Sequence, residues 1–305
     1  MKDGKGYTMK KISILFLISL FLISCSLPFT INWNTPTSQP KEDLPSTEAP
    51  PVEDATLPPA TEAPPTPEPI NGTEMNLGGV YMVLPPCLAA GASGTLVAAA
   101  PYDEMGGPME FYPENRKITY QGYPLSGKFF DAKLVVYPVA EFVAMNQSVA
   151  DRVGAMQNAL ASQQIPETVP LLPIFNAAQV FKAQAELISF QNGQGIRYLT
   201  EYAQYYAPAT NQDLFYSFQG ITSDGKYWVS AIFPVNAAYL QESFDNPAVP
   251  PGGIPAPSFD DPNLDASMTA YYGNMINLFN NTPDGDFIPG LDCLDQYIST
   301  LQIGD

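Results

Sequence analysis

Residues 74–305 are predicted to form a single α+β domain, an antiparallel sheet with helices packed on its faces. Three observations predict this fold class: strand-like segments separated by hairpin-turn dipeptides, helical repeats of apolar residues on either side of them, and the absence of the low complexity that marks the preceding residues. The length lies in the upper range for one domain and allows a sizeable core.

The middle of this region predicts the sheet most clearly. The dipeptides Asn192-Gly193 and Asp224-Gly225 lie between neighbouring apolar segments, and such dipeptides readily adopt the positive φ angles that hairpin turns need. The sequence therefore predicts a meander of antiparallel strands. In the last two strands apolar residues occupy both faces, so we expect both faces of the sheet to be covered. The four expected strands are 187–191, 195–203, 214–222 and 227–235.

Further elements are expected on both sides of this meander. Additional strands are predicted at 80–84, 95–100, 117–123 and 132–139. Ser148 and Asp151 have capping-box spacing and predict the start of a helix, with a helical turn over 140–146 before it. Further helices are predicted from the spacing of apolar residues at 176–186, 265–280 and 290–301.

The N-terminal segment has the features of an export signal. Lys10 and Lys11 precede an uncharged apolar run, 12–23, that is shorter than a membrane-spanning helix requires. Residues 22–25 resemble the lipobox of bacterial lipoproteins. The resemblance implies that residues 1–24 are a lipoprotein signal peptide and that Cys25 receives a thioether-linked diacylglycerol. The alternative is a plain secretory signal that contains a cysteine; whether Met1 or Met9 is the start stays open.

The composition then changes to a linker rich in Pro, Thr and Glu over residues 25–73. Such a segment lacks the apolar surface to form a core and is expected to be disordered. Its prolines and mutually repelling carboxylates favour an extended chain. We interpret it as a spacer between the lipid and the domain in the cell envelope; the alternative is a Pro-rich ligand for a partner domain.

The charge balance excludes one class of partner. The chain carries 13 Lys and Arg against 31 Asp and Glu, a net charge of −18. Removal of residues 1–24 takes away four Lys and one Asp, which leaves 9 basic and 30 acidic residues and a net charge of −21. Phosphate backbones and anionic head groups repel such a chain, so nucleic acid is excluded as a partner and the lipid must bind the membrane. A cationic partner and simple solubility are the two remaining interpretations of the charge.

The chain contains no histidine. This excludes Ser-His-Asp and Cys-His nucleophile activation and metal sites with imidazole ligands. Besides Cys25 only Cys87 and Cys293 are present, too few for an all-thiolate zinc site. In an oxidising exterior we expect them to form a disulfide; the alternative is two separate buried thiols. The sequence predicts no cofactor and no metal.

Two acidic segments have a simpler interpretation than cation binding. Asp261 and Asp265 have the spacing that opens an EF-hand loop, but Ala266 and Tyr272 stand where that loop needs Gly and Glu. With Asp260 they are interpreted as a turn and an N-cap. The segment 284–286 is likewise expected to be a turn.

Carboxylate-pair hydrolysis needs no histidine, and Glu186 and Glu201 are its candidate residues. Tyrosine suits ligand-binding surfaces, and Tyr198 and Tyr202 share a strand face, but packing in the sheet and core is the favoured interpretation of the aromatic cluster. That cluster comprises Tyr198, Tyr202, Tyr205, Tyr206, Tyr216, Tyr227 and Trp228.

The order of elements over 117–301 resembles PsbP-like secreted and lipoprotein domains, and this resemblance implies a binding or assembly role. The sequence therefore predicts a membrane-anchored extracytoplasmic lipoprotein whose domain binds an envelope protein or a cell-wall component without transforming it. The competing hypotheses are a carboxylate-based glycan hydrolase and a purely structural surface protein.

Overall fold

The computed structural model describes residues 70–102 and 111–304, all of which belong to one compact unit. The predictions for the signal peptide, for Cys25 and for the linker up to residue 69 lie outside the described residues. Within the described ranges no helix has both the length and the apolar character needed to cross a membrane.

The main sheet has seven strands, all paired antiparallel, in the order β3-β4-β5-β11-β10-β8-β7. The chain builds β3 to β5 as one meander, crosses to the far edge, and returns through β7, β8 and β10 to β11, which pairs with β5. The predicted α+β class is confirmed. The strands are β3 (Gly91–Val97), β4 (Asn115–Gln121), β5 (Lys133–Pro138), β7 (Ala183–Phe190), β8 (Gly193–Thr200), β10 (Phe215–Thr222) and β11 (Tyr227–Pro234).

Both faces of the central strands are buried, as expected. Tyr216 and Phe218 of β10 belong to one core cluster, whereas Ile221 of β10 and Trp228 of β11 belong to a second cluster. All eight residues of β10 are buried. The sheet is therefore the middle layer of three.

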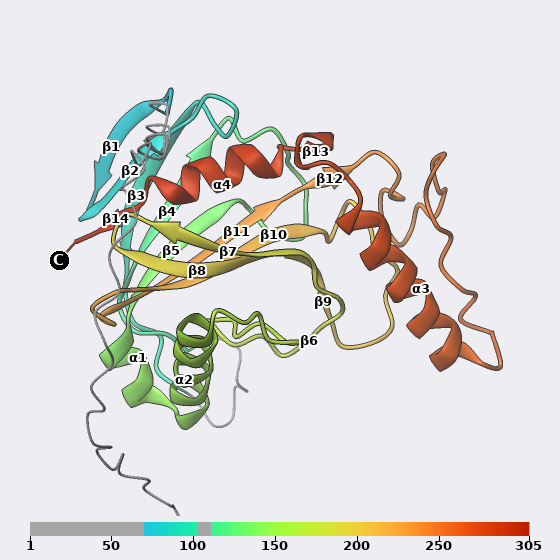
Figure 1. The fold of residues 1–305 in the computed structure, drawn as a ribbon, viewed down its shortest axis with the longest axis horizontal. Coiled ribbons are helices and arrows are strands. Elements are labelled where there is room, and N and C mark those ends of the chain that lie inside the picture. Colours follow the sequence, from blue (N-terminus) through green and yellow to red (C-terminus); the bar gives the residue numbers. More distant parts are fainter. Residues whose placement is uncertain (1–69, 103–110, 305) are drawn as a thin grey trace, which may run out of the picture. The chain divides into compact units, whose positions relative to one another are not determined.

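One covering layer consists of α1 (Val139–Met145) and α2 (Gln147–Ser162), which follow β5 (Figure 1). Val149, Val153 and Met156 of α2 are buried in the second core cluster. The predicted capping box is wrong: the backbone N–H of Ser148 donates instead to the side chain of Asn146, at 2.8 Å. Asn146 is thus the N-cap, two residues before Ser148.

The other layer contains α4 (Leu291–Ser299) and a small sheet ordered β1-β2-β14 (Figure 1). The small-sheet strands are β1 (Thr73–Leu77), β2 (Val80–Leu84) and β14 (Gln302–Ile303). The Sγ atoms of Cys87, just after β2, and of Cys293, in α4, lie at disulfide distance, 2.10 Å. The helix α3 (Leu264–Asn280) buries Met268, Tyr271, Met275 and Phe279 in the core cluster that also contains Tyr216 and Phe218. The short elements η1 (Asp284–Asp286), β12 (Asn236–Ala237) and β13 (Phe287–Ile288) complete this part.

The helix predicted at 176–186 is wrong. This segment contains β6 (Ala178–Gln179) and the start of β7, where Ala183 pairs with Leu199 of β8. Gln184 has a φ of 50° within a bulge, and its side chain donates to the backbone oxygens of Phe279 and Thr282 at the end of α3. Tertiary contacts with α3 and β8 thus override the local helix propensity.

Two smaller predictions also need correction. The strand expected at 95–100 begins earlier, at Gly91, and Ala100 forms only an isolated bridge with Tyr112. The turn between β7 and β8 consists of Gln191 and Asn192, because Gly193 already pairs with Phe190. A Cβ on Gly193 would collide with the Phe190 ring, so close packing rather than a positive φ requires glycine there.

Candidate ligand-binding site

A two-stranded ribbon outside the main sheet supports a large hollow in the described surface. It pairs β6 with β9 (Tyr202–Ala203), in the register Ala178 to Ala203 and Gln179 to Tyr202. Figure 1 shows the ribbon beyond one end of the sheet, with α2 and α3 on either side. The strand β8 ends at Thr200; Glu201 after it is still buried, and the chain becomes half-buried in β9 and exposed from Gln204 to Tyr206.

The aromatic cleft is a hollow of about 930 Å³ on this ribbon. Aromatic rings and side-chain amides line it, and none of its lining residues carries a charge. Tyr205 is 73% exposed and Tyr206 is 39% exposed, so their rings are accessible to a ligand. The residues that give the cleft its chemistry are Phe175, Asn176, Gln179, Gln204, Tyr205, Tyr206 and Tyr272.

Hydrogen bonds to α3 hold the wall of the aromatic cleft. The Tyr272 hydroxyl donates to the backbone oxygen of Ala207 (2.9 Å) and accepts from its backbone N–H (3.1 Å). The Tyr206 hydroxyl donates to Oδ1 of Asp265, at 3.0 Å. The loop that carries both exposed tyrosines is therefore fixed to a long helix, and the cleft is preformed.

A second hollow, the Glu201 cavity, adjoins the aromatic cleft and has a volume of about 300 Å³. The two share the lining residues Asn176, Ala177, Ala203, Gln204 and Tyr205. The Glu201 cavity differs from the cleft in its charge, because two carboxylates line it and no Lys or Arg does. Its remaining lining residues are Phe129, Phe130, Glu201, Tyr202, Ala207 and Asp213.

Glu201 is the most unusual side chain in this cavity. It is 2% exposed, and neither carboxylate oxygen makes a hydrogen bond of normal geometry with a described residue. Burial raises the pKa of Glu201 well above its ordinary value, the Asp213 carboxylate raises it further, and the backbone of Thr210 opposes the rise. Asp213 in contrast accepts a hydrogen bond from Oγ1 of Thr210, at 2.8 Å. The cavity thus combines an acid that favours its protonated form with a partly exposed, hydrogen-bonded carboxylate.

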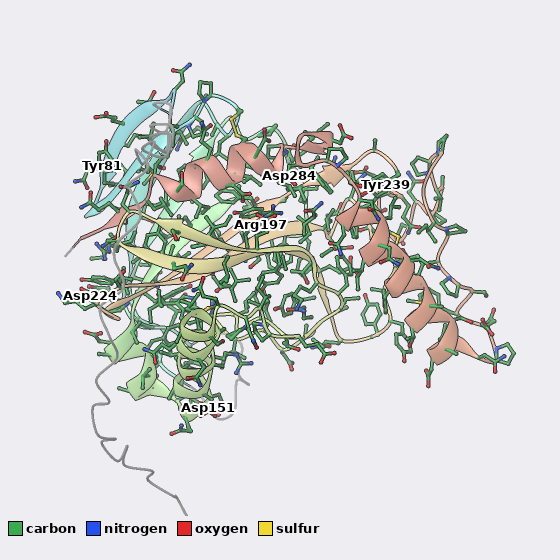
Figure 2. All side chains as sticks on the ribbon, viewed as in Figure 1. Tyr81, Asp151, Arg197, Asp224, Tyr239 and Asp284 are labelled. Carbon is green, nitrogen blue, oxygen red and sulfur yellow. A yellow bond between two sulfur atoms is a disulfide. The ribbon has the colours of Figure 1, made fainter. Side chains whose placement is uncertain are left out.

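The other candidate carboxylate, Glu186, belongs to a different cluster. Arg197 of β8 is 1% exposed and lies 3.2 Å from Glu186, 3.4 Å from Asp284 and 3.4 Å from Asp295 of α4. Figure 2 shows Arg197 and Asp284 near each other between the sheet and α4. The Tyr216 hydroxyl donates to Asp295, at 2.8 Å. These contacts hold α4 on the sheet. Glu186 lines neither the aromatic cleft nor the cavity that contains Glu201.

The predicted aromatic cluster separates into buried, half-buried and exposed members; the half-buried ones are Tyr202, which lines the Glu201 cavity, and Tyr227 at the start of β11. Tyr198, Tyr216 and Trp228 are fully buried, which agrees with the packing interpretation. Tyr205 and Tyr206 are exposed at the aromatic cleft. The sequence did not indicate Phe129, Phe175, Asp213 or Tyr272. For Phe129 and Phe175 the available signal was an aromatic residue in a loop, where neither strand nor helix packing explains it; Tyr272 lies in α3, and no signal singled out Asp213.

The acidic segments near Asp261 and Asp284 form a turn and a short helix. The Asp261 carboxylate accepts from the backbone N–H of Asn263 and from the Ser267 hydroxyl. The N-cap of α3 is Asn263 and not an aspartate, which corrects that part of the prediction. Among the described residues no group of three or more Cys, Asp or Glu is arranged to hold a metal ion. Asp284 belongs to the one-turn helix η1, beside Arg197.

No known protein family matches the chain, and no curated protein or solved structure is significantly similar to it.

Proposed function

We propose that this chain is a membrane-anchored extracytoplasmic lipoprotein, lipidated at Cys25, whose domain binds a component of the cell envelope at the aromatic cleft without transforming it. The single observation that carries the proposal is the cleft itself, which presents exposed tyrosines and three amide side chains on a preformed wall. Tyrosine combines a large apolar ring with a polar hydroxyl, which suits a ligand with both apolar and polar faces.

The chemistry of the aromatic cleft supports binding over catalysis. None of its lining residues is acidic or basic, so neither a general acid nor a nucleophilic carboxylate faces a ligand there. The side-chain amides of Asn176 and Gln204 each have an NH2 donor group and a carbonyl acceptor, the complement of a ligand rich in hydroxyl and amide groups; Gln204 also donates to the backbone oxygen of Asn176. A cell-wall glycan with its peptide substituents has this chemistry, and we take isolated cell-wall sacculi as the test ligand.

The experiment is co-sedimentation of the full, lipidated chain in detergent with isolated sacculi. We expect saturable binding that weakens by about tenfold or more in the double variant Tyr205→Ala, Tyr206→Ala, since each ring contributes contact energy of the order of 1 kcal/mol. Tyr102→Ala is the matched control, because Tyr102 is 40% exposed and does not line the cleft. Binding that is unchanged in the double variant, or that the control variant loses equally, would contradict the proposal.

One observation favours a second candidate function, the carboxylate-based glycan hydrolase. Glu201 and Asp213 line one cavity, and burial favours the protonated form of Glu201, which is the form that a general acid needs. We expect the chain to hydrolyse neither peptidoglycan nor common polysaccharides, because the glycan occupies the aromatic cleft, whose lining residues include no acid, whereas Glu201 and Asp213 line the adjoining cavity. Turnover that Glu201→Gln abolishes, with the fold unchanged by circular dichroism, would establish the hydrolase instead.

A further inference from the structure

The Glu201 cavity contains an unsatisfied buried acid that the aromatic cleft does not use. Both Glu201 oxygens are inaccessible and have no hydrogen bond of normal geometry in the described part of the chain. A buried carboxyl group without partners costs free energy, on the order of 1–3 kcal/mol. The Thr210 backbone offsets part of that cost but does not cancel the rise in the pKa of Glu201, which makes the carboxyl group a candidate for contact with a ligand.

The surroundings of Glu201 select the charge of such a ligand. Asp213 adds a second carboxylate, and no basic side chain lines the cavity. The whole chain is also strongly acidic, with a net charge of −18 before any processing, so the protein's field attracts cations and repels anions. A negatively charged ligand is therefore excluded, and a positively charged one is favoured.

The aromatic rings select an organic cation over a metal ion. Phe129, Tyr202 and Tyr205 line the cavity, and Phe129 is 65% exposed. Lys133 already lies 5.5 Å from the centroid of Phe130, so that ring shows the same cation–π contact with a residue of the chain itself. Aromatic rings beside carboxylates recognise ammonium groups, whereas a metal ion needs more oxygen ligands than the two carboxylates here provide.

We propose that the Glu201 cavity binds an ammonium group of the envelope ligand, with the Asp213 carboxylate, the Glu201 carboxyl group, which releases its proton to solvent as the ammonium binds, and the neighbouring aromatic rings as its contacts. This inference rests on the proposed function, because the cavity shares five lining residues with the aromatic cleft. The uncharged part of the ligand occupies the aromatic cleft, and its amine-bearing end enters the cavity.

A pair of small probes isolates the effect of the charge. Choline and 3,3-dimethylbutan-1-ol have nearly the same shape, and only choline is charged. Isothermal titration of the full chain in detergent should show choline binding about tenfold or more tightly than the neutral alcohol, since a charge-assisted contact contributes at least the free energy of that factor. Equal affinity of the two probes, or the absence of choline binding, would overturn the inference.

Variants place the effect at the cavity. Glu201→Gln keeps the size of the side chain and removes its ability to ionise when a cation binds, and it should reduce the preference for choline to threefold or less. Glu141→Gln makes the same chemical change on an exposed position of α1, away from the cavity, and should keep the full preference. Asp213→Asn, which keeps the oxygen that accepts from Thr210, is the second variant and should also lower the preference. A preference that survives both cavity variants would place the cation elsewhere and refute the assignment.

N-acetylation of the sacculi distinguishes this inference from the proposed function. Acetylation converts free amines into neutral amides and leaves the glycan in place. Weaker binding of acetylated sacculi supports the ammonium contact. Equal binding of both preparations refutes the ammonium contact and leaves the proposed function standing, whereas no binding of either preparation refutes the proposed function.

Discussion

Asp295 of α4, which contacts Arg197 of the sheet, carries a prediction whose magnitude follows from the structure. Burial raises the pKa of Asp295 from its ordinary value of 3.8 to about 6; the Arg197 guanidinium and the Tyr216 hydroxyl oppose the rise, and Asp284 and Glu186 add to it. One pH unit corresponds to about 1.4 kcal/mol. Ionisation of Asp295 therefore costs the folded state about 3 kcal/mol relative to the unfolded chain, an order-of-magnitude figure.

The sign of the pH dependence follows from proton binding. Between pH 3.8 and about 6 the folded state holds the Asp295 proton more tightly than the unfolded state does. The contribution of Asp295 to the free energy of unfolding is therefore largest below pH 3.8 and is lost as the pH rises through about 6. Asp295→Asn cannot ionise, so the variant should gain about 3 kcal/mol relative to wild type between pH 4 and pH 7.5.

Urea unfolding at several pH values, followed by the fluorescence of the buried Trp228, measures this change. The change in the difference between variant and wild type from pH 4 to pH 7.5 cancels any effect of the substitution that does not depend on pH. Asp292→Asn is the matched control, because Asp292 lies exposed in the first turn of the same helix. A stability difference for Asp295→Asn that stays constant from pH 4 to pH 7.5 would refute this account of the Arg197 cluster.

The remaining predictions concern the disulfide and the linker. Non-reducing peptide mapping should recover Cys87 joined to Cys293, and free thiols at both positions would contradict the pairing. Since the two cysteines are 206 positions apart, reduction should lower the free energy of unfolding by up to about 5 kcal/mol on the chain-entropy model. A fragment of residues 70–305 should unfold at the same urea concentration as the full chain, because β1 begins at Thr73 and the linker composition provides no core; a lower midpoint would show that the linker contributes to stability.

The sheet and most helices were predictable because their signals are local. The apolar faces of β10 and β11 and the repeat of Val149, Val153 and Met156 in α2 follow strand and helix periodicity. The failure at 176–186 has the opposite cause. Ala183 and Gln184 become part of an edge strand through contacts with β8 and with the end of α3, more than ninety residues away in the chain.

The candidate site was only partly predictable for the same reason. Glu201 was identified as a carboxylate that a hydrolase would need, but its burial and its proximity to Asp213 depend on the ribbon of β6 and β9, which the sequence did not predict. Tyr205 and Tyr206 were recognised as members of an aromatic cluster. Whether such rings enter the core or line a cleft depends on where β8 ends, and periodicity alone does not define that end.

Lipidation of Cys25 is the central claim, since it defines the compartment in which the cleft meets its ligand. Mass analysis of the N-terminal peptide of the protein isolated from membranes tests it most directly. The account predicts a mature N-terminus at Cys25 that carries a thioether-linked diacylglycerol, and the loss of this species in Cys25→Ala. An unmodified Cys25, or a mature N-terminus at any other residue, would contradict the account.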